Sequence, residues 1–151
     1  MADLALTRIT VAIDGSKHAE RALAFGIDLA KRYGASLSIV AVAPLVPLYV
    51  SSTEPWVPTE VPQSEIAHYR KVLDAAVAQA QEDGVASVTG LCLEGVIVDE
   101  IIALLEHHPT DLLIMGSRGL STAKRLLLGS VSDAVAHHVK CPVLIVRGSE
   151  P

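Results

Sequence analysis

The chain has 151 residues, half of them apolar, which suits one domain of ordinary size with a large core. With 12 Lys and Arg against 17 Asp and Glu, its formal charge of −5 argues against the counterion release that drives binding to DNA or RNA. No apolar stretch reaches the roughly 18 residues of a membrane span, and the N-terminus carries no signal-peptide pattern. We therefore expect a cytoplasmic protein with no nucleic-acid partner and no membrane attachment.

The first third of the sequence predicts a strand, a helix and a second strand. The strand Arg8–Ile13 (RITVAI) is apolar and β-branched, and Ser16 is expected to cap the helix that follows the next turn. Apolar residues recur at helical spacing over residues 17–32, and Gly34 marks the end of that helix. Residues 35–43 (ASLSIVAVA) are predicted to form the second strand.

The periodic pattern stops between residues 44 and 63. Five of the eight prolines fall between Pro44 and Pro62, and the same segment holds Trp56, the only tryptophan. A loop of about twenty residues is long for a compact domain and is more often functional or mobile than a short loop. A tolerated insertion is the alternative interpretation.

The second half of the sequence alternates helices and strands. The predicted elements are a helix at 64–83, a strand at 85–93, a helix at 98–107, a strand at 111–115, a helix at 130–138 and a strand at 142–146. Ser64 is the expected N-cap of the first of these helices. Such alternation is typical of a parallel sheet with helices on both faces, so we predict one doubly wound α/β domain over residues 1–151.

Two of the predicted strand ends carry residues suited to a ligand. The first strand is followed by Asp14-Gly15-Ser16, and the fourth by Gly116-Ser117-Arg118-Gly119. In an open parallel sheet, ligands bind beyond the carboxyl ends of the strands, where the strand order reverses. If these two strands are neighbours, both turns line one crevice.

The segment MGSRGLSTAKRLLLGS has the glycine spacing Gly116-x2-Gly119-x9-Gly129-Ser130. Glycines at 116 and 119 would let the backbone take positive φ and would let a ligand approach the amides closely. The last helix opens at Gly129 and Ser130, and the first amides of a helix lack internal partners and favour a phosphate. Further donors and cations nearby are Ser132, Arg118, Lys124 and Arg125.

The same glycines also have a purely structural interpretation as turn residues. Ser130 and Asp133 resemble a capping box, in which Ser130 would serve its own helix and Asp133 would repel an anion. The sequence contains no GxxxxGK[ST] pattern, so a lysine-centred nucleotide site of that kind is not expected. From these residues alone, the phosphate and turn interpretations both stay open.

GSRG followed by nine residues and GS, after an apolar strand, resembles the ATP-binding subgroup of the universal stress protein family. VAIDGSKHAERALAFGIDLAKRYGASLSIVAV is similar to the family's opening strand, helix and strand, and KCPVLIV is similar to its closing strand. The resemblance implies an open, five-stranded parallel sheet of order 3-2-1-4-5, like that of the adenine nucleotide alpha hydrolases. One departure is Gly95-Val96-Ile97, where family members often have Gly-x-Pro before the third helix.

Carried over by position, the resemblance implies a set of residues around ATP or another adenine nucleotide. Asp14 would contact the adenine or ribose side, and Ala43 would offer its backbone to the adenine edge. The residues around ribose and phosphates would be Gly116, Arg118, Gly119, Gly129, Ser130, Val131 and Ser132. Mg²⁺ or Mn²⁺ would bridge the phosphates, although the sequence shows no dedicated metal cluster, and we assign no catalytic residue.

Histidines and cysteines offer weaker candidates. The pairs His107-His108 and His137-His138 cannot chelate from one helical face, because adjacent helix residues point about 100° apart. His18 is expected to be a solvated helix residue or to edge the crevice. Cys92 and Cys141 lie far apart and have no local base, which favours structural thiols in a reducing compartment.

The last predicted strand, residues 142–146 (PVLIV), is apolar and expected at an edge of the sheet. The backbone groups of an uncovered edge strand can pair with another chain, and the simplest closed assembly is a homodimer through this strand. The resemblance also implies such a homodimer. The preferred hypothesis is a dimeric, adenine-nucleotide-binding regulatory protein of stress physiology. The alternatives are slow ATP hydrolysis in the same pocket, with Asp14 as the only acidic candidate, and a nucleotide-independent module that meets an unidentified protein partner.

Overall fold

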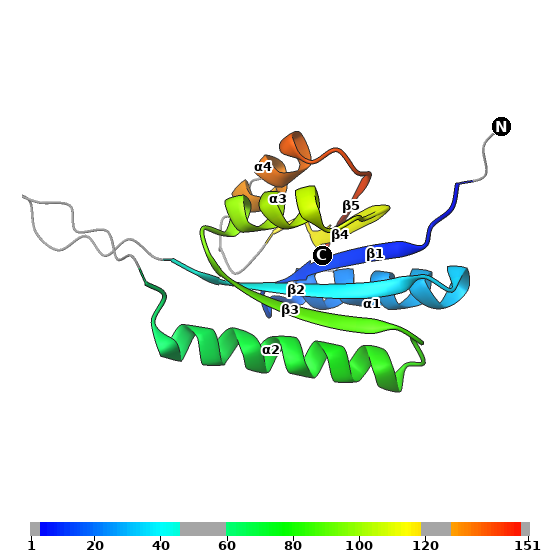
Figure 1. Cartoon of the computed structure of the whole chain (residues 1–151), viewed down its shortest axis with the longest axis horizontal. Helices are drawn as coiled ribbons and strands as arrows, with labels where there is room; N and C mark the ends of the chain where they lie inside the picture. The colour runs from blue at the N-terminus through cyan, green and yellow to red at the C-terminus, as the bar shows by residue number, and fades with distance from the viewer. Residues whose placement is uncertain (1–3, 46–59, 119–127, 149–151) are drawn as a thin grey trace, which may run out of the picture.

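The computed structural model describes residues 4–45, 60–118 and 128–148, and within them five parallel strands form one sheet (Figure 1). The elements in chain order are β1 (Arg8–Ile13), α1 (Lys17–Tyr33), β2 (Ser36–Pro44), α2 (Gln63–Glu82), β3 (Val88–Gly95), α3 (Ile97–His107), β4 (Leu112–Gly116), α4 (Ser130–His138) and β5 (Val143–Val146). No helix among the described residues is both long enough and apolar enough to cross a membrane. Most of the predicted long loop, residues 46–59, lies outside the described residues.

The strand order is β3-β2-β1-β4-β5, which confirms the order expected from the family resemblance. β1 lies between β2 and β4, with Ile9 opposite Leu112 and Ala12 opposite Met115. Because β1 and β4 are parallel, this register brings the turns that follow them to the same end of the sheet, at the carboxyl ends of the strands. The crevice expected between them therefore has its two strands side by side.

The N-terminal ends of β1 and β4 are fixed to each other by Asp111. Its Oδ1 accepts from Arg8 Nη2 at 3.2 Å, and its Oδ2 accepts from the Thr7 hydroxyl at 2.9 Å and the Arg8 amide at 2.8 Å. The bond from the Arg8 side chain, followed by those from Thr7, holds the pKa of Asp111 well below its ordinary value. The carboxylate thus stays charged at neutral pH and keeps the two strands in register.

The two helical layers fill the two faces of the sheet to different extents. In Figure 1, α1 and α2 cover one face, and α3 and α4 cover the other. α1 alone buries six residues, whereas α3 buries Ile101 and α4 buries Ser132 and Val135. α1 approaches the sheet so closely that a Cβ at Gly26 would lie 2.4 Å from Val11 Cγ2. The layer of α3 and α4 buries fewer residues than the layer of α1 and α2, and the cavity described below lies on that face.

The largest difference between a predicted and an observed element boundary is at the start of β3. β3 begins at Val88, three residues after the predicted start, because Val85 belongs to the turn after α2, where its amide donates to the Ala80 carbonyl. Val85 is apolar because it is buried beneath the helix, with 6% of its surface exposed, and its apolar character does not reflect sheet pairing. An apolar residue at the edge of a core looks the same in sequence as the first residue of a strand.

Of the two serines predicted to cap helices, one does so. Ser16 Oγ accepts from the Ala19 amide at 3.2 Å at the start of α1, which confirms the first prediction. The second prediction is wrong, because α2 begins at Gln63, one residue before Ser64, and Pro62 occupies the N-cap position without a side-chain bond. The backbone carbonyl of Pro62 accepts from the Glu65 amide at 3.0 Å and begins the helix.

This contrast gives a matched pair of substitutions. Ser16→Ala should lower the free energy of unfolding by about 1 kcal/mol, because the Ala19 amide loses its acceptor. Ser64→Ala should change it by less than about 0.5 kcal/mol, because the Ser64 side chain is exposed and caps nothing. Urea unfolding measures both values, and equal losses in the two variants would contradict the assignment of caps.

Candidate functional site

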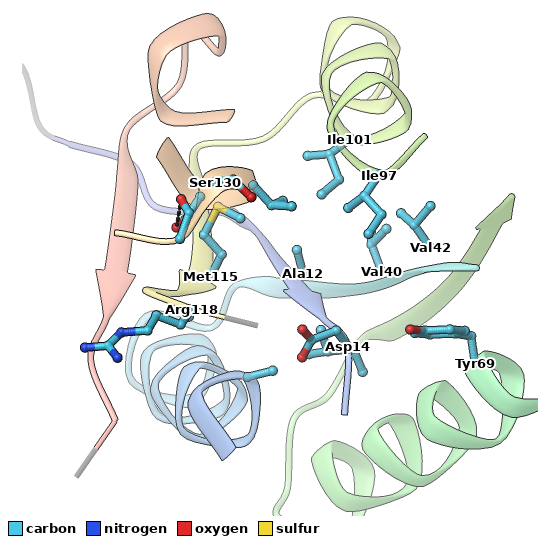
Figure 2. Close-up of a pocket in the computed structure, with 16 residues that line it drawn as sticks. Ala12, Asp14, Val40, Val42, Tyr69, Ile97, Ile101, Met115, Arg118 and Ser130 are labelled. Carbon is cyan, nitrogen blue, oxygen red and sulfur yellow. Dashed lines mark hydrogen bonds between the residues drawn. The ribbon is translucent and has the colours of Figure 1, made fainter. Parts of the chain in front are cut away.

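A cavity of about 350 Å³ opens at the carboxyl ends of β1 and β4, on the face covered by α3 and α4 (Figure 2). Of the predicted site residues, the structure brings the following to its walls: Asp14, Gly116, Arg118, Gly129, Ser130, Val131 and Ser132. Gly119 lies outside the described residues. The predicted turns thus meet at one cavity of the size that small-molecule ligands occupy in proteins.

Ala43 does not line this cavity. Its side chain is fully buried in the core between the sheet and the layer of α1 and α2. Successive residues of a strand point to opposite faces, so it is Val40 and Val42 of β2 that face the cavity. A contact from the Ala43 backbone to a ligand remains a prediction.

Gly116 and Gly129 are needed for space. The positive φ expected at Gly116 is wrong, since it is absent from the described glycines that have one, namely Gly15, Gly34, Gly84 and Gly95. A Cβ at Gly116 would instead lie 2.8 Å from the Cβ of His18, and a Cβ at Gly129 would lie 3.2 Å from the Ser117 carbonyl oxygen. Both glycines therefore permit close approach of neighbouring backbone segments at the cavity.

The start of α4 opens into the cavity with its amides available. Gly129 occupies the N-cap position without a side-chain bond, and Ser130 is the first helical residue, with an exposed side chain. The capping-box interpretation of Ser130 and Asp133 is therefore wrong, and Asp133 Oδ1 lies 3.4 Å from His137 Nε2 along the helix. The amides of residues 130–132 stand at the positive end of the helix dipole, where an anion is favoured.

Ser132 has a different role from the one expected. Its hydroxyl donates to the Ser117 carbonyl at 2.9 Å and lies 3.1 Å from the Gly129 carbonyl, and the residue is 3% exposed. The hydroxyl hydrogen is thus engaged within the protein, so the expected free donor for phosphate is wrong for this side chain. Ser132 instead fastens the start of α4 to the end of β4.

Ser117, which the sequence analysis did not single out, connects the end of β4 to three other elements. Its amide donates to Val146 of β5 at 2.8 Å, and its carbonyl accepts from the Gly129 amide at the start of α4. Its hydroxyl lies 3.1 Å from His18 Nδ1 on α1. The Gly148 amide also donates to His18 Nδ1 at 2.9 Å, which makes that nitrogen an acceptor and the Ser117 hydroxyl a donor.

His18 is therefore half-buried against the end of β4, and the expectation of a solvated helix residue is wrong. Arg118 lines the cavity, but Figure 2 shows its side chain extending away from Asp14. Asp14 itself accepts from the Ser16 amide through Oδ1 at 2.9 Å. This bond holds the carboxylate at the edge of the cavity.

The other half of the cavity is apolar and was not predicted. Figure 2 shows Val40 and Val42 of β2 opposite Ile97 and Ile101 of α3, with Tyr69 of α2 beside them. In the sequence, each of these residues looks like an ordinary core residue of its own strand or helix. They form the wall of a cavity only because the parallel sheet brings β2 opposite α3 and because α3 and α4 leave the space between them unfilled.

The cysteines and paired histidines do not form a second site among the described residues. Cys92 and Cys141 are half-buried free thiols, and burial raises the pKa of each, which keeps them protonated and unreactive at neutral pH. His108 Nε2 lies 3.0 Å from the Ser38 hydroxyl, and His138 Nδ1 lies 2.7 Å from the Ala134 carbonyl oxygen. No group of three or more His, Cys, Asp or Glu side chains in the described ranges is placed to hold a metal ion.

Comparison with known proteins gives a consistent family. The model of the universal stress protein family matches residues 6–147. Universal stress protein YxiE of Bacillus subtilis is 36% identical over 148 residues, which cover 93% of this chain and 98% of that one. The fold is similar to that of universal stress protein UspA from Lactobacillus plantarum, with a TM-score of 0.83 at 23% identity over 96% of this chain and all of that one.

Two further solved structures are complexes with nucleotides. A universal stress protein in complex with cAMP has a TM-score of 0.70 and 28% identity, covering 95% of this chain and 98% of that one. The universal stress protein from Archaeoglobus fulgidus in complex with dAMP has a TM-score of 0.65 and 20% identity, covering 94% of this chain and 98% of that one. The second comparison bears on the fold alone.

The connecting role of Ser117 predicts a measurable cost when its hydroxyl is removed. Ser117→Ala should lower the free energy of unfolding by about 1 kcal/mol, because a partly buried hydrogen bond to His18 is lost. Ser87→Ala is the matched control, because Ser87 is exposed, and its change should stay below about 0.5 kcal/mol. Both values follow from urea unfolding, and a Ser117→Ala change no larger than the control's would show that this bond does not stabilise the site.

Proposed function

The chain belongs to the universal stress protein family, and on that premise we propose that it binds an adenine nucleotide, ATP above all, in the cavity beyond β1 and β4. The observation that carries the proposal is the N-terminus of α4, which opens into the cavity with the amides of residues 130–132 free of helical partners. A relative of the same fold is described as a complex with cAMP, which supports an adenine nucleotide as the ligand.

The cavity has parts suited to each part of such a ligand. The amides of Ser130, Val131 and Ser132 would bind the phosphates, and the wall around Val40 and Ile97 would receive the flat, apolar adenine. Mg²⁺ or Mn²⁺ would accompany the phosphates, for which the Ser130 hydroxyl offers an oxygen ligand of the kind these ions prefer. Phosphate oxygens and water would supply the remaining ligands.

The arrangement supports binding better than hydrolysis. Asp14 is the only acidic side chain among the described residues that line the cavity, and its Oδ1 already accepts the Ser16 amide. Figure 2 places it across the cavity from Ser130, where the phosphates would lie. A general base must reach the attacking water within hydrogen-bond distance, which favours a regulatory ligand over a substrate.

A proline at position 130 tests the role of the α4 amides directly. Ser130→Pro should weaken ATP binding about tenfold or more, because it removes an amide donor to a charged phosphate. The helix itself should form, because proline is favoured at the first helical position and Gly129 already has the extended conformation that precedes a proline, with φ −70° and ψ 161°. Calorimetric titration with ATP and Mg²⁺ measures the dissociation constants.

Ser130→Ala is the matched control, because it removes the hydroxyl and keeps the amide, and it should weaken binding less than Ser130→Pro does. Equal affinities of the two variants would show that the amide of residue 130 does not bind phosphate. Repeated absence of nucleotide from gently purified protein, together with no ATP binding in the titration, would refute the proposed function. ATP turnover that survives both Asp14→Ala and Gly119→Ala would point to a contaminating enzyme.

We further propose that the protein is a cytoplasmic homodimer joined through β5. β5 lies at an edge of the sheet, and its residues Val143, Leu144 and Ile145 are only half-buried. An apolar edge strand of this kind is completed when a second copy pairs with it about a two-fold axis. Residues 142 and 146 point their carbonyls toward β4, where they accept from the amides of Leu113 and Ser117.

Because backbone groups alternate in direction along a strand, the amide of Ile145 points to the free edge. Ile145→Pro should therefore turn the dimer into a monomer without removing a bond to β4, because proline is tolerated on an edge strand and cannot donate across it. Ile145→Val is the matched control and should stay dimeric. Light scattering after size-exclusion chromatography gives the mass, and a monomeric unaltered protein would contradict the proposed dimer.

A further inference from the structure

Two polar side chains, Asp14 and Tyr69, stand at the end of the cavity that lies away from α4. Asp14 follows β1, and Tyr69 comes from α2, with 7% of its surface exposed. Figure 2 shows the phenol oxygen of Tyr69 directed across the cavity toward the Asp14 carboxylate. Between them and the start of α4, Figure 2 shows the side chains of Ala12 and Met115.

The Tyr69 hydroxyl has no hydrogen-bond partner among the residues that the structure describes. The ring makes an edge contact with His68, at 5.1 Å between centroids, and the cavity wall beside it is formed by Val42 and Ile97. The hydroxyl is not among the fully buried polar atoms without a partner in the described residues, so it opens into the cavity, where a bound molecule can pair with it. In ligand cavities, isolated polar groups of this kind fix the orientation of the ligand.

The two groups have complementary hydrogen-bonding character. Burial, followed by the charges of Asp14 and Glu65, raises the pKa of Tyr69, so its hydroxyl remains a donor at neutral pH. Asp14 is an acceptor whose Oδ1 receives the Ser16 amide, which leaves Oδ2 open to a ligand. A donor and an acceptor on one side of a cavity match two adjacent hydroxyl groups, each of which both donates and accepts.

We infer that the Tyr69 hydroxyl binds a ribose hydroxyl beside Asp14, whose place at the adenine or ribose side the family resemblance implies, and that Tyr69 makes the cavity selective for ribonucleotides in which both the 2′ and 3′ hydroxyls are free. This inference rests on the proposed function. In a nucleotide the sugar lies between the phosphates and the base, and in Figure 2 Asp14 and the phenol oxygen of Tyr69 face the space between Ser130 and Val40. Nucleotides that lack the 2′ hydroxyl, or whose 3′ oxygen is closed into a cyclic phosphate, leave one of the two groups unpaired.

Calorimetric titration with ATP, 2′-deoxy-ATP and 3′-deoxy-ATP tests the inference. The unaltered protein should bind ATP at least tenfold more tightly than the weaker of the two deoxy forms, because a buried polar group then loses its partner. Tyr69→Phe should weaken ATP binding about tenfold and should leave the binding of that deoxy form within about twofold. Tyr33→Phe is the matched control, because Tyr33 is 60% exposed at the far end of α1, and it should change neither affinity.

Equal affinity of the unaltered protein for all three nucleotides would overturn the inference without requiring any variant. A Tyr69→Phe variant that loses the same factor for ATP and for both deoxy forms would overturn it too, because the hydroxyl would then contact another part of the ligand. Either result leaves the proposed function in place, since ATP still binds. Failure of the unaltered protein to bind any adenine nucleotide removes both proposals together.

Discussion

Ser117 holds the end of β4 against α1, α4 and β5, and the shape of the cavity depends on these hydrogen bonds. Its amide, carbonyl and hydroxyl each reach a different element, and Ser132 adds a second bond to the same carbonyl. The residues on either side of it, Gly116 and Arg118, are cavity residues. Because the backbone at this point is fixed from three directions, the first amides of α4 face the cavity in a defined position before any ligand arrives, which reduces the ordering cost of binding.

The cavity also depends on the difference between the two helical layers. α1 lies so close to the sheet that Gly26 has no room for a side chain, and the core on that face is continuous. On the other face, α3 and α4 are 11 and 9 residues long and pack against each other without filling the space in front of Val40 and Val42. A short helical layer therefore provides the volume, and the carboxyl ends of the strands provide the polar groups.

Much of the fold could be predicted because its determinants are local. Helical spacing, the glycine after α1 and apolar strands are visible within a dozen residues, and the resemblance supplied the strand order. The roles that could not be predicted depend on residues that are distant in the sequence. Ser117 bonds to residues 99 positions before it and 29 after it, and Tyr69 faces Asp14 across the cavity only once α2 has packed against the sheet, so neither role leaves a local signal. Of the two reasons given for the glycine at 116, positive φ is wrong, because a sequence cannot distinguish a need for positive φ from a need for space.

The same bonds that shape the cavity connect it to the rest of the molecule. The Ser117 amide reaches Val146 at the end of β5, and the Gly148 amide reaches His18, which in turn contacts Ser117. The cavity and the edge strand are therefore joined through one buried residue. A ligand shifts a conformational equilibrium only through different affinities for the two states, and such coupling is reciprocal. If pairing at β5 restricts Ser117, it stabilises the arrangement that binds phosphate at α4, and a nucleotide at α4 then strengthens pairing at β5 by the same factor.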